Sequence, residues 1–259
     1  MNVSVVEHNT SSTEYGAPFC KAEGASESSY GEFPEAGMWA LRATLEPDTT
    51  ISWSSDPGDE GVYGIDGAVE VAGDSLPAPV VCETETAIII ESGASVTVRA
   101  LGRATIWHSG GCAPDPYIDG PLNRPFSAGH GVHIVPRSEA EEVVHRRPDG
   151  TETFSTFYAD GVCRTCRIAF FKNGSNAAIT GPSHTHSQNE VIHVTNGELQ
   201  MGTVTVRAGS SVFVPADMRY SFRTPGPWEF LNFRRGIAYY VGHPREEPRL
   251  ETWDGLAHL

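Results

Sequence analysis

Two histidines and one glutamate stand close together in the second half of the chain. His184 and His186 are two residues apart, and Glu190 follows four residues later. On an extended strand, residues two apart point to the same face, so both imidazoles can reach one point in space. Glu190 opens the run 190–194, which reads as a strand ending in a turn at Asn196-Gly197. The returning chain would bring the carboxylate beside the imidazoles, a set of ligands typical of a divalent metal.

The elements that would carry these residues read as strands throughout. Short runs of alternating apolar residues recur between Gly, Pro and Asp, which is typical of an all-β sandwich or barrel. The expected strands are 39–45, 50–53, 67–71, 87–90, 94–101, 167–171, 198–201, 204–206, 211–214, 220–223 and 228–233. A single short helix is expected near 138–144.

The two halves of the chain echo each other. Glu190 lies seven residues before Gly197, and Glu60 lies the same distance before Gly67. Each glycine leads into a short expected strand. We interpret this register, offset by 130 residues, as a duplicated β-barrel.

The N-terminal copy keeps the glutamate but not the imidazoles. Ser54 stands opposite His184 and Asp56 opposite His186 on this register. We therefore expect the N-terminal barrel to have lost its metal. Ser54, Asp56 and Glu60 could still form a vestigial polar pocket, although a solvated loop is the favoured interpretation.

The expected organisation has five parts. They are an N-terminal arm (1–37), a degenerate N-terminal barrel (38–110), an interdomain segment (111–160), a metal-binding C-terminal barrel (161–242) and a C-terminal tail (243–259).

The second half resembles the cupin superfamily of small double-stranded β-helix, or jelly-roll, barrels. The first motif of that family, G-x5-H-x-H-x3,4-E-x6-G, is matched by His184, His186, Glu190 and Gly197, with Ala178 in place of the leading glycine. The second motif, G-x5-P-x-G-x2-H-x3-N, is matched only at Gly209 and Pro215; Asp217, Tyr220 and Thr224 replace its Gly, His and Asn. The resemblance covers about residues 165–240 and implies two tandem cupin-type barrels.

The resemblance implies a metal but leaves the reaction open, because cupins include oxygenases, decarboxylases, isomerases, lyases, cyclases and binding proteins. Three protein ligands suit Fe²⁺ that binds O₂ and a chelating substrate, so a dioxygenase acting on a small organic molecule is our first hypothesis. Zn²⁺, Mn²⁺ or Ni²⁺ acting as a Lewis acid in an isomerase, lyase or cyclase is the second. A non-catalytic bicupin that binds or senses a small molecule is the third. The alternative to the metal site itself is a degenerate cupin that keeps the three residues only as polar lining of the barrel.

Tyr220 stands where the family has its fourth ligand. A neutral phenol is a poor ligand for Zn²⁺ or Mn²⁺, although a ferric centre could bind it as phenolate. We expect it instead to hydrogen-bond a metal-bound group or the substrate and to act as general acid or base. The alternative is a tyrosine that only packs in the barrel.

Strand alternation nominates further residues of the barrel interior as substrate contacts. They are Met218, Phe222, Gln200, Asn232 and Arg234. His193 falls on the opposite strand face from Glu190 and is expected to be a packed or interface histidine.

Composition excludes several partners. A net charge of −15 over 259 residues argues against nucleic acid and anionic membranes. The N-terminus lacks the pattern of a secretion signal, and five cysteines form no disulfide framework, so we expect a cytoplasmic protein. Cys163 and Cys166 are expected to be free thiols, with a structural zinc or a redox pair as alternatives. Dimerisation is expected from the resemblance, because such barrels often pair through their sheets.

Overall fold

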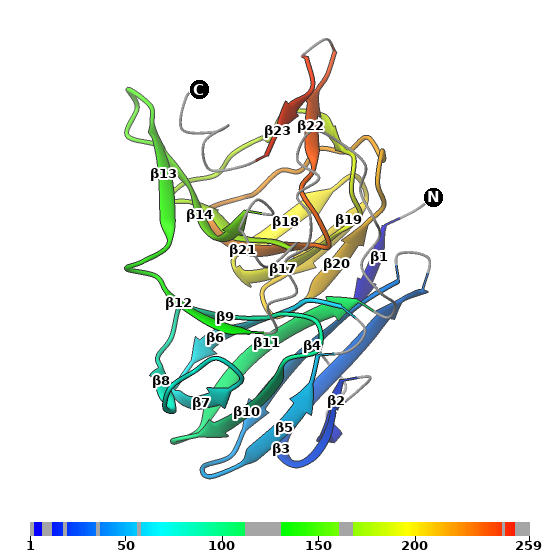
Figure 1. The fold of residues 1–259 in the computed structure, drawn as a ribbon. Coiled ribbons are helices and arrows are strands. Elements are labelled where there is room, and N and C mark those ends of the chain that lie inside the picture. Colours follow the sequence, from blue (N-terminus) through cyan, green and yellow to red (C-terminus); the bar gives the residue numbers. More distant parts are fainter. Residues whose placement is uncertain are drawn as a thin grey trace. The chain divides into compact units, whose positions relative to one another are not determined.

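The computed structural model describes residues 3–6, 12–17, 20–34, 37–55, 58–111, 131–160, 168–244 and 247–251. These residues fall into two compact units. The N-terminal unit contains the described residues from 12 to 139, and the C-terminal unit contains residues 3–6 together with those from 140 to 251. Nearly all ordered elements are strands, as the sequence predicts (Figure 1).

The N-terminal unit is built from two antiparallel sheets. The larger has the order β12 (Val132–Pro136), β9 (Thr86–Ile90), β6 (Glu60–Asp66), β11 (Ala104–Gly111), β4 (Met38–Leu45), β3 (Cys20–Phe33) and β2 (Ser12–Ala17). The smaller has the order β5 (Thr50–Ser54), β10 (Ser95–Ala100), β7 (Val69–Gly73) and β8 (Val80–Cys82). One apolar core joins residues of both sheets, including Ile88 and Ile106 from the larger and Val71 and Val98 from the smaller.

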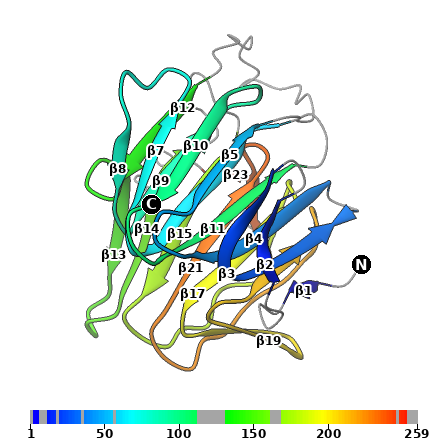
Figure 2. The same cartoon turned by 90° about the horizontal axis from the view of Figure 1, so that it is seen from below.

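The large sheet of the C-terminal unit has seven strands. Its order is β1 (Ser4–Val6), β20 (Ser211–Val214), β17 (Glu190–Asn196), β21 (Trp228–Arg234), β15 (Ala169–Ser175), β14 (Glu152–Asp160) and β13 (Glu141–Arg146). Figure 2 shows β17, β21 and β15 side by side within this unit.

Two small sheets face it. They are the ribbon of β18 (Glu198–Met201) with β19 (Val204–Arg207), and the sheet of β16 (His184–His186), β22 (Tyr239–Gly242) and β23 (Arg249–Leu250). Single bridges tie the segment 220–223 to both small sheets, through His184–Tyr220 and Gln200–Arg223. The interior between the layers is apolar away from β16, with Ile192, Leu199 and Phe230 among its members.

The two units repeat one topology. Each large sheet places the strand that begins with a glutamate third in line, between equivalent neighbours: β9, β6, β11 in one and β20, β17, β21 in the other. The glycine that ends the glutamate strand has a positive φ in both copies, +75° at Gly67 and +72° at Gly197. A Cβ atom there would collide with the backbone of Arg103 or Pro227, so only glycine fits. The predicted tandem fold is confirmed.

Two expected elements differ from the structure. Residues 138–144 do not form a helix, because Glu141–Arg146 is strand β13, paired antiparallel with β14, and Val143 is its buried residue. Part of the expected N-terminal arm lies in the N-terminal unit as β2 and β3, and Ser4–Val6 pairs with β20 of the C-terminal unit. Likewise, β12 and β14 lie inside the segment expected to connect the barrels.

Strand β1 covers one edge of the sheet that carries Glu190. Val5 pairs with Val212 and packs on the apolar core of the C-terminal unit. We predict that Val5→Asp lowers the free energy of unfolding by roughly 1–3 kcal/mol, because it sets a carboxylate without a partner against the apolar core at a partly buried position. Ser4→Asp, on the opposite face of the strand, is the matched control for urea unfolding and should cost less. Equal losses in the two variants would contradict the assigned register.

Candidate metal and substrate site

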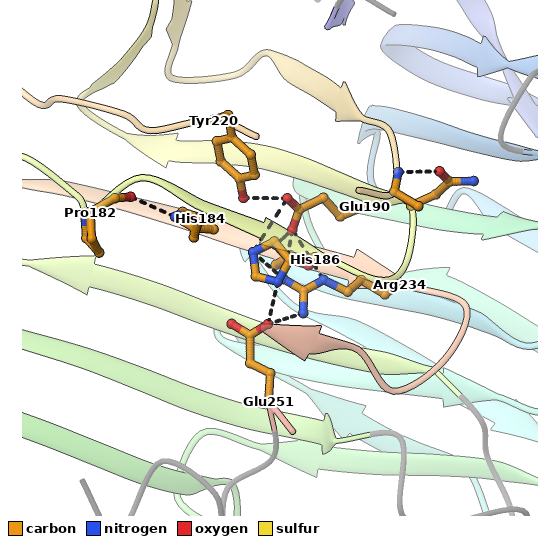
Figure 3. Close-up of polar contacts among 10 residues, drawn as sticks. Pro182, His184, His186, Glu190, Tyr220, Arg234 and Glu251 are labelled. Atoms are coloured by element: carbon orange, nitrogen blue, oxygen red, sulfur yellow. Dashed lines mark hydrogen bonds and ion pairs between the residues drawn. The ribbon is translucent and has the colours of Figure 1, made fainter. Parts of the chain in front are cut away.

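The two histidines and the glutamate lie together inside the C-terminal unit (Figure 3). His184 and His186 are the two ends of β16, and Glu190 is the first residue of β17. Their exposed fractions are 5%, 4% and 0%. The alternation of β16 turns both rings inward, with ring centroids 4.8 Å apart. The sequence pattern therefore predicted which three side chains come together.

Both imidazoles have one ring nitrogen next to an acceptor. His184 Nδ1 lies 2.8 Å from the carbonyl oxygen of Pro182. His186 Nδ1 lies 3.0 Å from a carboxylate oxygen of Glu251. Burial is the main cause that lowers the pKa of His184, and the neighbouring His186 is the second. Both favour the neutral ring. A neutral ring that donates from Nδ1 keeps the lone pair of Nε2 for a ligand.

Tyr220 donates its hydroxyl proton to Glu190 Oε1. Its backbone also forms an isolated bridge with His184, and the two rings are 4.3 Å apart between centroids. Burial and the Glu190 carboxylate both raise the pKa of Tyr220 well above its usual value. The side chain is thus a protonated phenol that contacts Glu190 in this arrangement.

Arg234 is a buried cation in the middle of the site. Its Nη2 lies 2.8 Å and its Nε 3.2 Å from Glu190 Oε2, and its Nη1 donates to Glu251. The same Nη2 lies 3.4 Å from His186 Nε2. Asn232 donates to Glu190 Oε2 at 2.7 Å. Asn232 and Arg234 were nominated as substrate contacts, but here their donors are engaged with carboxylates of the protein.

The charges of this cluster stabilise one another. Burial alone would raise the pKa of Glu190, but the neighbouring His186 and the Arg234 guanidinium outweigh it and lower that pKa to about 2. Burial also raises the pKa of Glu251. The charges of Arg234 and His186 outweigh this effect and hold that pKa below its usual range. Although burial opposes it, the two carboxylates raise the pKa of Arg234. At neutral pH two carboxylates and one guanidinium are therefore ionised in the interior.

The three side chains have the donor atoms that a divalent metal requires, but in this structure those atoms do not converge on one point. Two imidazoles and one buried carboxylate are the ligand types that such an ion requires; His184 is held through Nδ1 by Pro182, and His186 Nδ1 lies beside Glu251 without an aligned hydrogen bond. His186 Nε2 and Glu190 Oε1 are 3.9 Å apart. Across the described ranges, no three His, Cys, Asp or Glu side chains converge closely enough to hold an ion as they stand. The Glu190 carboxylate is turned to Arg234 and Tyr220 instead.

The other nominated residues separate into two groups. Met218 and Phe222 pack against the apolar core of the unit, on the interior side as expected. Gln200 lies away from the site, because Leu199 and Met201 are the buried residues of β18. Its side chain lines an outer hollow of about 280 Å³ with Arg223 and contacts Glu198.

His193 and the cysteine pair were the remaining sequence candidates. His193 is fully buried on the opposite strand face from Glu190, with Nδ1 3.0 Å from Ser211 Oγ. It is thus a packed histidine. Cys163 and Cys166 lie outside the described residues.

Sequence reasoning missed two residues of the site. Glu251 comes from the expected C-terminal tail and contacts both His186 and Arg234. Tyr240 on β22 stacks on His184 with centroids 5.0 Å apart. The aromatic and β-branched residues of 239–241 were a signal that could have revealed a strand there, but no sequence pattern links that strand to its distant partner β16.

The N-terminal unit has a different cluster at the corresponding place. Glu60 Oε2 accepts hydrogen bonds from Trp53 Nε1 at 2.8 Å and from His108 Nε2 at 2.9 Å. Glu60 is 2% exposed, so the solvated-loop interpretation was wrong for this residue. Ser54 is exposed and bonds Ser95, while Asp56 lies outside the described residues. This cluster contains one carboxylate and one imidazole.

Fold and site together describe a protein with two tandem cupin-type jelly-roll units, the second of which carries the histidine pair. No family model and no curated protein matches the chain. Solved structures do match it. They include oxalate decarboxylase from Bacillus subtilis (14% identity, 92% of this chain and 78% of that chain covered, TM-score 0.64) and the protein Ylba from E. coli (11%, 95% and 93%, 0.64). A putative glyoxylate-induced protein from Pseudomonas aeruginosa is similar as well (15%, 95% and 91%, 0.65). At these identities the likeness establishes the fold, which confirms the cupin resemblance at that level.

No helix among the described residues is long and apolar enough to cross a membrane.

The ion pairs of Arg234 should be a large contribution to the stability of the C-terminal unit. We predict that Arg234→Met lowers the free energy of unfolding by about 3–5 kcal/mol, because it leaves two buried carboxylates without their cation. Urea unfolding of the metal-stripped protein measures this effect. Arg207→Met, at an exposed arginine, is the control and should change stability by less than about 0.5 kcal/mol. A loss in Arg234→Met as small as in the control would show that the network is not formed.

Proposed function

We propose that the chain is a metal-dependent cupin enzyme that acts on a small organic molecule in its C-terminal unit. His184, His186 and Glu190 would hold the metal. The observation that carries the proposal is the orientation of the two buried rings, each of which has its Nδ1 next to an oxygen acceptor. Metal-binding histidines are oriented in this way by a carbonyl or a carboxylate. Glu251 thus acts as a positioning residue for His186.

Fe²⁺ is the first metal we propose, and a dioxygenase or related oxygenase the first activity. When bound by three protein ligands, such an ion offers open positions for O₂ and for a chelating substrate. The residues of this chain supply the surroundings. Tyr220 and Tyr240 cover the two sides of His184 and shield it from water. The Tyr220 hydroxyl keeps a proton beside Glu190, where it is available to a reacting group.

A non-oxidative reaction is the second candidate. Zn²⁺, Mn²⁺ or Ni²⁺ would then polarise the substrate in an isomerase, lyase or cyclase. The observation that supports it is the hydrogen bond from the Tyr220 hydroxyl to Glu190, which places a proton donor beside a proposed metal ligand. One of the similar structures is named an oxalate decarboxylase. A binding protein without catalysis is the third candidate, and the cytoplasmic location and the homodimer remain predictions.

Metal analysis combined with oxygen uptake tests the first candidate. We expect the anaerobically purified protein to take up one Fe²⁺ per chain and to consume O₂ only with substrate. His184→Ala and His186→Ala should each lose the metal, because either change removes one ligand. Zinc at one equivalent with no oxygen uptake would favour the non-oxidative candidate. A protein that accepts no metal at any concentration would leave only the binding function.

Tyr220→Phe tests the proton at Glu190. We expect it to keep the metal and lose at least about 10²-fold in turnover, the range typical of a positioned proton donor. Tyr239→Phe, on the exposed side of β22, is the matched control and should retain full turnover. An unchanged turnover in Tyr220→Phe with unchanged metal content would remove the phenol from the mechanism.

A further inference from the structure

The place between Glu190 and His186 is filled by a cation that belongs to the protein. Arg234 Nη2 is 2.8 Å from Glu190 Oε2 and 3.4 Å from His186 Nε2. These are two of the three groups assigned to the metal. Arg234 itself is 1% exposed, so the guanidinium is fixed in the interior and not loosely placed at the barrel mouth.

The guanidinium and a metal cannot use Glu190 at the same time without a cost. Glu190 Oε2 already accepts hydrogen bonds from Arg234 and Asn232, and Oε1 accepts the Tyr220 proton. A divalent ion at these ligands would also lie within a few ångströms of a buried positive charge. Like charges so close in a poorly hydrated interior repel strongly.

The N-terminal copy has no arginine at the position equivalent to Arg234. Val62 and Ile192 each lie two residues after the glutamate that begins their strand. Val62 pairs with His108 and Ile192 pairs with Asn232, so His108 and Asn232 occupy equivalent positions. Two residues further along, Arg234 corresponds to Gly110. A Cβ atom at Gly110 would lie 2.8 Å from Glu60 Cγ and 2.9 Å from a ring carbon of Trp39, so a larger side chain there would force both neighbours to move. Only the copy with both imidazoles holds the guanidinium.

Glu251 gives the arginine a second carboxylate. Arg234 Nη1 donates to Glu251, whereas Nη2 and Nε contact Glu190. The guanidinium can therefore release Glu190 and stay paired with Glu251. The buried charge then keeps a partner in both arrangements, which avoids the high cost of an unpaired ion.

We propose that Arg234 is a built-in competitor of the metal at Glu190, so that the site has a closed form held by the guanidinium and an open form that binds the ion. This inference rests on the proposed metal site. Strand alternation led us to expect that Arg234 contacts the substrate. We now assign it a different role, in which it sets the affinity of the site for the metal. Removing the guanidinium should strengthen metal binding, although it weakens the fold.

Isothermal titration of the chelator-stripped full chain with Mn²⁺ and with Zn²⁺ tests the competition. We expect Arg234→Met to bind at least tenfold more tightly than the wild type, and Arg207→Met to bind as the wild type does. Arg234→Lys keeps the positive charge but loses the paired contact of Nε and Nη2 with Glu190. Its gain in metal affinity should therefore be smaller than that of Arg234→Met. Adding His186→Ala to each variant should abolish binding, which locates the ion at this site.

Each result decides a different question. Equal or weaker binding in Arg234→Met and Arg234→Lys, still abolished by His186→Ala, would overturn the competition and leave the metal site intact. No His186-dependent binding in any variant would overturn both the metal site and the competition. If Arg234→Met does not fold without metal, the metal-induced rise in melting temperature of Arg234→Lys replaces the titration. A rise no larger than that of the wild type would then count against the proposal.

Discussion

Arg234 places its guanidinium between the carboxylates of Glu190 and Glu251, where water cannot reach it. An ionised carboxylate in an apolar interior is costly unless a partner compensates its charge. Here each carboxylate also touches a further group, Tyr220 in one case and His186 in the other. Tyr220, Asn232 and His186 each contact at least one of these three charged groups, whereas His184 is held by the carbonyl of Pro182. A metal bound here would have to compete with Arg234, which already compensates much of the negative charge of the two carboxylates.

The jelly-roll topology explains how residues so distant in sequence meet. The central strand β17 lies between β20 and β21, which sets Glu190 near Asn232 and Arg234. In the opposite layer β22 pairs with both β16 and β23, and this brings Glu251, which follows β23, to His186. Both layers use antiparallel pairing with inward-facing alternate residues. The apolar core below the site holds the layers at a fixed spacing.

The sequence predicted the local part of this arrangement well. Spacing and alternation on one strand suffice to place His184 and His186 together, and the family motif adds Glu190. The same reasoning could not reveal Glu251, because no local pattern links a tail residue to a strand more than sixty residues away. It also misassigned 138–144, where helix-forming residues were overridden by pairing with β14. The role of Arg234 depends on which carboxylates surround it, and only the packed structure shows that.

The competition between Arg234 and a metal for Glu190 can be observed directly. Crystal structures of the protein stripped of metal and of the same protein loaded with Mn²⁺ would show both forms at atomic detail. The account predicts that the guanidinium contacts Glu190 only in the stripped protein, and that in the loaded protein it remains with Glu251 while Glu190 binds the ion. An ion held by His184, His186 and Glu190 with the Arg234–Glu190 contact unchanged would contradict it.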